Sequence, residues 1–209
     1  MEVKKITTKE CHDLILNVHY AHRLPSISFA YGLFEDGNLI GCCTFGSPAS
    51  PSLVKGVCGG KYMRNVIELN RLVLKFNRKN EASFLVSKAL SLLPKPKVVI
   101  SYADTAQNHT GIVYQATNFL FTGTSKPRTD IDTGEKHSRH YEGITDYTKR
   151  KYRSAKHRYI MFLGSKVEKK NMMRELQYKV LEYPKNHTHD LHPQPLQKLL
   201  AEEVAYHSL

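Results

Sequence analysis

The stretch that decides the fold is Val98–Phe119, VVISYADTAQNHTGIVYQATNF. It opens on a continuous apolar run, which is typical of a buried strand and is expected to span Lys97–Ala103. Polar side chains follow, and Thr110–Phe119 has the spacing of a short helix. Its inward face is expected to hold Ile112, Ala116 and Phe119. The segment therefore predicts a strand–helix unit of an α/β protein, with polar residues at the carboxyl end of the strand.

The neighbouring segments extend this unit into a mixed sheet. A strand over Val66–Leu74 and a helix over Ala82–Leu93 come before it, so two strand–helix crossovers follow one another, and parallel pairing is expected. Asp36-Gly37 lies between two apolar runs and predicts an N-terminal β-hairpin. Further strands are expected over Leu120–Thr124, His140–Ile144 and His157–Leu163. The fold class predicted is α/β (α+β), with a mixed central sheet.

The chain of 209 residues is long enough for one domain with a sizeable core. We expect a catalytic domain over residues 1–164, followed by a basic C-terminal helix and tail over residues 165–209. An N-terminal helix capped by Thr8 is expected before the hairpin. The Pro-, Ser- and Gly-rich stretch Ser47–Gly60 predicts a loop.

Charge points to a polyanionic partner. The formal net charge is +12, from 31 Lys and Arg against 19 Asp and Glu. Such an excess favours nucleic acid through counterion release, although a basic chain can also be merely soluble. The cations expected to contact phosphates are Lys149, Arg150, Lys151, Arg153, Lys156 and Arg158. The interleaved Tyr147, Tyr152 and Tyr159 offer stacking faces for unpaired bases.

The sequence predicts a soluble, cytoplasmic protein. No apolar run approaches the roughly 20 residues that cross a bilayer, and the first ten residues lack the apolar region of a secretory signal. The four cysteines show no paired spacing, which argues against a disulfide framework. Adjacent Cys42 and Cys43 are expected on opposite faces of a strand.

Three groups of polar residues are candidates for chemistry. Asp104 lies where the Lys97–Ala103 strand ends, and ligands bind beyond the carboxyl ends of parallel strands. Capping the next helix would need one polar residue, whereas several are present. The segment 19–23, HYAHR, offers acids, bases or metal ligands. Arg71 is a charged residue inside a strand, and either binds an anionic cofactor or pairs with Glu68 or Asp104.

These residues also carry a family resemblance. HYAHRLP at 19–25, ELNRL at 68–72 and YADTAQNHTGIVYQATNF at 102–119, followed by FTG, resemble the Mom family of phage DNA-modification proteins. The similarity runs over residues 19–143. It implies a divergent relative of the GNAT acyltransferase fold. It also implies an enzyme that converts adenine N6 in DNA to a methylcarbamoyl derivative and so protects phage DNA from host restriction.

The resemblance assigns roles residue by residue. It places the catalytic groups at His19, Tyr20, Asp104 and Tyr114. It places the cofactor side at Arg71 and Ser83, with acetyl-CoA or another acyl or glycyl donor as the implied cofactor. An iron ion held by His19, His22 and Asp104 is the implied metal. The stretch KFNRKNEASF after Leu74 departs from the pattern, because it lacks the glycines that let a diphosphate approach the backbone in GNAT enzymes.

The mechanism expected is modification of an adenine flipped out of double-stranded DNA. Asp104 is the expected base, with His19 as the alternative, while Tyr20 and Tyr114 donate hydrogen bonds. Two other functions stay open. One is a GNAT-type acyltransferase acting on tRNA or protein, and the other is a non-catalytic DNA-binding anti-restriction protein. The oligomeric state is open between monomer and homodimer.

Overall fold

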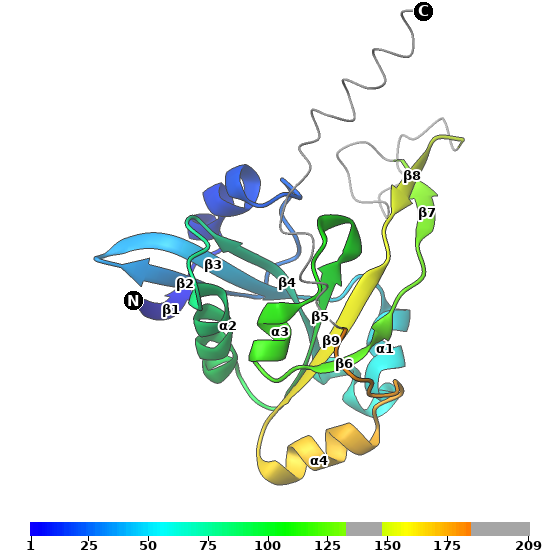
Figure 1. The fold of residues 1–209 in the computed structure, drawn as a ribbon. Coiled ribbons are helices and arrows are strands. Elements are labelled where there is room, and N and C mark those ends of the chain that lie inside the picture. Colours follow the sequence, from blue (N-terminus) through cyan, green and yellow to red (C-terminus); the bar gives the residue numbers. More distant parts are fainter. Residues whose placement is uncertain (133–147, 185–209) are drawn as a thin grey trace, which may run out of the picture.

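A seven-stranded mixed sheet organises the part of the chain that the computed structural model describes, residues 1–132 and 148–184 (Figure 1). Only β4 and β5 are parallel neighbours; the other pairs are antiparallel. The predicted fold class is confirmed. In order across the sheet, the strands are β1 (Glu2–Ile6), β2 (Phe29–Glu35), β3 (Asn38–Gly46), β4 (Val66–Leu74), β5 (Lys97–Asp104), β9 (Lys156–Leu163) and β6 (Leu120–Thr124).

The predicted hairpin is confirmed. Asp36 and Gly37 join β2 to β3 with positive φ values of 49° and 79°. Two-residue turns of this hand match the twist of paired strands, and Asp and Gly tolerate the left-handed region better than other residues do. The cysteines on β3 also lie as expected, because Cys43 belongs to the main core and Cys42 to a separate apolar cluster.

Both predicted crossovers are present. Helix α2 (Glu81–Leu92) links β4 to β5, and α3 (Ile112–Ala116) leads from β5 to β6, with β9 between these two strands. The inward face predicted for the second helix is confirmed for Phe119, which is buried in the core, and wrong for Ile112 and Ala116, which are exposed. Gly111, at φ 82°, starts the helix later than expected, so Val113 and Tyr114 pack against the core instead.

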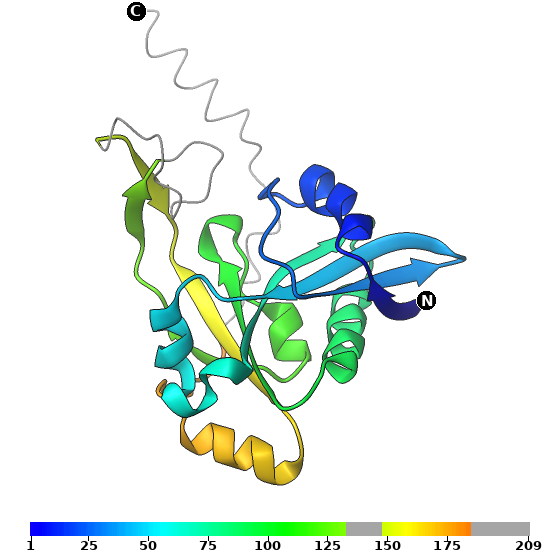
Figure 2. The same cartoon turned by 180° about the vertical axis from the view of Figure 1, so that it is seen from behind.

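The opposite face of the sheet carries α1 (Pro51–Cys58) and α4 (Lys166–Arg174), which Figure 2 shows from behind. The loop predicted over Ser47–Gly60 is therefore wrong in its middle. Ser50 accepts a hydrogen bond from the Leu53 N–H at 3.2 Å, and Pro51 stands at the first helical position, where it needs no donor. No helix in the described ranges is long and apolar enough to cross a membrane.

The N-terminal helical segment consists of a 3-10 turn at Lys9–Cys11 and a π-turn at Leu14–Val18. The predicted Thr8 directly precedes the 3-10 turn but makes no side-chain cap hydrogen bond, and Thr7 caps the turn instead. The Thr7 N–H donates to Glu10 Oε2 at 2.7 Å, and the Glu10 N–H donates to Thr7 Oγ1 at 3.3 Å. This reciprocal pair is a capping box. After Val18 the backbone becomes extended at His19. This residue begins the segment called here the site loop (residues 19–28).

A two-stranded ribbon, called here the arm, extends beyond the end of the sheet (Figures 1 and 2). It pairs β7 (Arg128–Ile131) with β8 (Arg150–Arg153), and β8 leads directly into β9. The strand predicted over His140–Ile144 and the predicted stacking residue Tyr147 lie outside the described residues.

Candidate active site at the end of β5

The central parallel strands separate before they end. β4 and β5 pair only as far as Leu69 opposite Ser101, although β4 runs on to Leu74 and β5 to Asp104. Ser101 Oγ donates to the Leu69 carbonyl at 2.9 Å at this last pair. Beyond this pair, β4 and β5 no longer bond to each other, and the ends of the two strands separate. Ligands of α/β sheets bind at such a separation.

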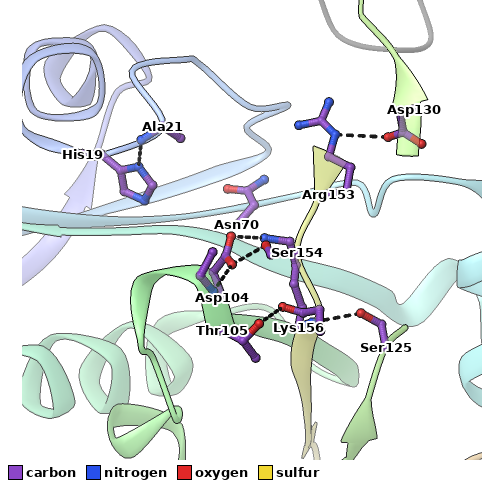
Figure 3. A network of polar contacts seen from close by, with 12 residues as sticks. His19, Ala21, Asn70, Asp104, Thr105, Ser125, Asp130, Arg153, Ser154 and Lys156 are labelled. Carbon is purple, nitrogen blue, oxygen red and sulfur yellow. Dashed lines mark hydrogen bonds and ion pairs between the residues drawn. The ribbon is translucent and has the colours of Figure 1, made fainter. Parts of the chain in front are cut away.

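Asp104 is held by three donors at this edge (Figure 3). Oδ1 accepts from the Ala106 N–H at 3.0 Å and from Ser154 Oγ at 2.5 Å, while Oδ2 forms an ion pair with Lys156 Nζ. Burial raises the pKa of Asp104, but the hydrogen bonds from Lys156, Ser154 and Ala106 outweigh it and leave the pKa below its usual value. The carboxylate is therefore ionised, with both oxygens engaged.

The turn after Asp104 is tied to the base of the arm. Thr105 donates to the Ala155 carbonyl through its N–H at 3.2 Å and through Oγ1 at 2.8 Å. On the other side of this junction, the Lys156 N–H donates to Ser125 Oγ at 2.9 Å. The end of β5 and the arm are thus fixed to one another by backbone contacts.

The ELNRL motif anchors the site loop. Arg71 donates to the Arg23 carbonyl from Nε at 3.3 Å and from Nη2 at 2.9 Å. Asn70 Nδ2 donates to the Ser26 carbonyl at 2.8 Å, and Asn70 Oδ1 accepts from Thr44 Oγ1 at 2.7 Å. Two neighbouring residues of β4 therefore hold the loop on both sides of Pro25.

His19 is a neutral hydrogen-bond donor in this arrangement. Its Nδ1 accepts the Ala21 N–H at 3.0 Å, so the proton of the neutral ring lies on Nε2. Burial lowers the pKa of His19 to about 4, with further lowering by the charges of Arg71 and His109. The ring therefore stays uncharged near pH 7 and offers its Nε2–H to a ligand.

The depressed pKa predicts how stability varies with pH. The folded state binds fewer protons at His19 than the unfolded state between the ordinary value of about 6.5 and about 4. The stabilisation is therefore complete above about pH 6.5 and is lost as the pH falls toward 4. We expect a smaller loss on acidification in His19→Asn than in the wild type, measured by urea unfolding at pH 7 and 4.5, with His12→Asn as the control. Long-range ¹⁵N correlation spectra that place the proton on Nδ1 would contradict the assignment.

Two phenols complete the site. Tyr20 stacks on His19 with ring centroids 4.4 Å apart and meets the His109 ring edge-on at 6.0 Å. Burial, followed by the Asp104 charge, raises the pKa of Tyr20. Burial raises the pKa of Tyr114 to about 12, against a hydrogen bond with Ser101 that lowers it. Both hydroxyls are therefore protonated at neutral pH and can donate hydrogen bonds.

The sequence profile of the Mom protein family matches residues 1–185. The chain belongs to the Mom protein family. The methylcarbamoylase Mom of Escherichia phage Mu is 30% identical over 130 residues, which cover 59% of this chain and 54% of that protein. The chain thus spans about half the length of this curated relative. The resemblance of the sequence to the Mom family is confirmed.

Solved structures with a similar arrangement include two acetyltransferases. A putative acetyltransferase from Salmonella typhimurium, solved with acetyl-CoA, has a TM-score of 0.48 at 12% identity, covering 79% of this chain and 95% of that chain. The ribosomal-protein-alanine N-acetyltransferase from Brucella melitensis has a TM-score of 0.48 at 11% identity, covering 78% and 100%.

The residues that the Mom resemblance selects as catalytic come together in space. The charges of Asp104 and Arg71 both shift the pKa of Tyr20. The charge of Arg71 also shifts the pKa of His19, and Tyr20 shifts the pKa of Tyr114. The sequence placed His109 in the polar run without giving it a role, and it predicted Lys156 as a phosphate contact and not as a partner of Asp104. His109 lies inside the polar run of 102–110, so that run was the available signal. Ser154 and Lys156 are some 50 positions from Asp104, so no sequence pattern indicated that they hold its carboxylate.

The predicted iron ligands do not form a preformed set, and that prediction is wrong for the described residues. There, no three His, Cys, Asp or Glu side chains lie where they could share a metal ion. The His22 ring bonds the Leu16 carbonyl through Nδ1 at 2.8 Å, and Nδ1 of His19 is engaged by Ala21. Asp104 is occupied by its own donors.

The predicted cofactor side does not fit the diphosphate of coenzyme A. Glu81 is buried in the first turn of α2, where its carboxylate accepts from the Arg78 N–H at 2.8 Å and from Arg78 Nε at 2.5 Å. A diphosphate there would meet a negative charge, which opposes the attraction that a helix N-terminus normally offers. Ser83 Oγ donates to the Asn80 carbonyl at 3.1 Å and is not aimed at a ligand.

The basic patch divides into an engaged part and an exposed part. Lys156 pairs with Asp104, Arg158 stacks on Tyr178 at 3.4 Å, and Arg153 pairs with Asp130 at 3.1 Å. The fully buried Tyr159 cannot stack on bases, so that prediction is wrong. The exposed part is on the arm and consists of Lys149, Arg150, Lys151 and Tyr152.

Proposed function

We propose that this chain is a DNA-modifying transferase that converts adenine N6 in DNA to a methylcarbamoyl (acetamido) derivative. One observation carries the proposal. In a member of the Mom family, the site loop, β5 and α3 bring His19, Tyr20, Asp104 and Tyr114 to one place at the separation of the central strands. A relative of the chain is named a methylcarbamoylase. Protection of phage DNA from restriction is the proposed role.

The polarity of this site suits an acceptor amine and a carbonyl-bearing donor. His19 Nε2–H and the hydroxyls of Tyr20 and Tyr114 are neutral donors, and no proton has to be lost before they act. Such donors stabilise negative charge that develops on a carbonyl oxygen. Adenine N6 is stacked and paired in a duplex, so the adenine must be flipped out to reach them, at a cost of about a few kcal/mol.

The donor is proposed only by class, as an activated acyl or glycyl compound. Arg71 lies beside the site and is the cation available to orient an anionic or carbonyl group of such a donor, although backbone carbonyls already engage it. The buried Glu81 argues against a diphosphate seated on α2. No step of the proposal is therefore assigned to coenzyme A.

The decisive test is the mass of the nucleosides in DNA exposed to the protein. The chain is expressed with a plasmid, the recovered DNA is digested, and a heavier adenine nucleoside is expected. Tyr114→Phe keeps the ring packing but removes the donor and should lower this nucleoside by about 100- to 1000-fold, at the roughly 3–4 kcal/mol typical of one such donor. Tyr62→Phe, on the opposite face of the sheet, is the control and should leave it unchanged.

Unmodified DNA in the presence of folded protein would contradict the proposal. Modified tRNA or protein in the same cells would support the acyltransferase alternative. DNA that is bound but unmodified would support the non-catalytic alternative. The arm is the proposed binding element in either DNA-directed case, since it carries exposed cations and its base is joined to the end of β5.

The exposed cations of the arm are expected to contact DNA phosphates. Replacing both Arg150 and Lys151 by alanine should reduce the slope of log K against log salt by about 2, because each phosphate contact contributes about 0.9. Fluorescence anisotropy with duplex DNA at several salt concentrations measures the slope. Lys166→Ala with Lys170→Ala, on α4 far from the arm in Figure 1, removes the same charge and should leave the slope as it is. Equal slopes in both double variants would remove the arm from the interface.

A further inference from the structure

We infer that His109 is the general base that takes the proton from the acceptor amine. The inference rests on the proposed function and names a group that neither the sequence motifs nor the family resemblance selects. Bond formation at an exocyclic amine releases a proton, because the nitrogen otherwise becomes cationic. A base within the site must accept it as the bond forms.

Asp104 is poorly suited to that step. Its Oδ1 already accepts two hydrogen bonds and its Oδ2 is paired with Lys156. A substrate proton would have to displace one of these donors, and protonation would leave the Lys156 ammonium without its counter-charge. The same contacts make the carboxylate a weaker base than a free one.

His19 is excluded by its tautomer. The lone pair of the neutral ring is on Nδ1, where it accepts the Ala21 N–H, and Nε2 carries a proton already. The group can therefore donate to a ligand, but it cannot accept a proton from one without first losing its contact with the loop backbone.

His109 has neither obstacle. Its side chain is only partly buried and meets Tyr20 edge-on, and within the described ranges its ring nitrogens have no hydrogen-bond partner. Its backbone N–H donates to the Asp104 carbonyl at 3.1 Å, and Asn108 precedes it in the left-handed region at φ 53°. The turn therefore fixes where the ring stands while leaving a lone pair available.

The charged groups around His109 keep it neutral. Burial lowers its pKa, the Lys156 ammonium lowers it further, and the Asp104 carboxylate raises it, with a net lowering. Tyr20 is protonated and His19 is uncharged at neutral pH, so neither adds charge nearby. A neutral imidazole is the state that a base requires.

The N6 lone pair forms the bond to the electrophilic methylene carbon of the donor, because attack at an acyl carbon would give an N6 amide and not the methylcarbamoyl group, which is attached through a methylene. The bond from that carbon to its leaving group breaks, and the leaving group departs with the electron pair. The N6 proton passes to the imidazole of His109, and the imidazolium returns it to the leaving group or to water. Asp104 acts here as a positioning residue, through the turn that carries His109.

The test uses clarified extract of cells that express the full chain, with added plasmid DNA and nucleoside mass as the readout. His109→Ala should lower modification by about 100-fold or more, as expected for loss of a general base. Added imidazole should restore a measurable part, because the exposed position leaves room for it. His109→Gln fills the position with a group that cannot titrate and should stay inactive with or without imidazole. His12→Ala is the control and should modify DNA as the wild type does.

Modification by His109→Ala within about threefold of the wild type would overturn the inference. A loss that imidazole does not restore would also overturn it and would give His109 a positioning role. Should His109→Ala fail to fold, His109→Gln decides, since near wild-type modification by that variant is incompatible with a proton-accepting role. Failure of the wild type to modify DNA would instead remove the proposed function, so the two failures are distinguishable.

Discussion

Replacing Gly46 by alanine is expected to lower DNA modification by about 100-fold or more while the sheet stays folded. A Cβ at this position would lie 1.7 Å from the Ser26 carbonyl oxygen and 2.9 Å from Asn70 Nδ2. The Ser26 carbonyl belongs to the backbone and cannot rotate away as a flexible side chain can. The site loop must therefore move away from the end of β3. That loop carries His19 and Tyr20, and a displacement of about 1 Å of reacting groups costs about 100-fold in rate.

The control for Gly46→Ala is Gly60→Ala, where an added Cβ would have no heavy atom within 4 Å. Nucleoside mass measures the modification, and thermal unfolding measures whether the fold is retained. We expect Gly46→Ala to cost about 1–3 kcal/mol of stability, as for other overpacked sites. Wild-type modification together with a wild-type melting temperature would show that the loop need not rest against β3.

The sequence predicted the elements that follow from local pattern. The apolar run of β5, the hairpin turn at Asp36 and the strand Val66–Leu74 were all read correctly, because their periodicity and turn residues depend on near neighbours. The errors have equally local causes. Pro51 was read as a loop residue although it starts α1, and Gly111 shifted the start of α3, which turned Ile112 outward.

The site was predictable in its location but not in its electrostatics. The polar run at the end of β5 indicated Asp104 and its surroundings, since strand ends collect ligands in this fold class. That Asp104 is held by Lys156 and Ser154 depends on the pairing of β5 with β9, which brings positions some 50 residues apart together. The tautomer of His19 depends on a single backbone N–H, and no sequence pattern specifies it.

The pairing of Asp104 with Lys156 leads to the second large effect. Asp104→Asn and Lys156→Gln should each lower modification by about 100-fold, because either change releases the junction between β5 and the arm. The double variant should be hardly worse than either single one, since residues that act as a unit are not additive. Lys166→Gln removes an exposed cation of α4, away from the site and the arm, and is the control. Nucleoside mass gives the level of modification in each variant.

A comparison of the two single variants shows whether Asp104 positions the turn or accepts the proton. If the Asp104 carboxylate accepted the proton itself, Asp104→Asn would be far more damaging than Lys156→Gln, and loss of Lys156 would make the remaining carboxylate a stronger base. Its folded pKa is held below the usual value, so the stabilisation it contributes is present above about pH 4 and is lost as the pH falls. In Lys156→Gln the free energy of unfolding should fall less on acidification than it does in the wild type. Near-equal effects of the two single variants on modification, with a reduced acid loss, therefore assign Asp104 to holding the turn and leave the proton to another group.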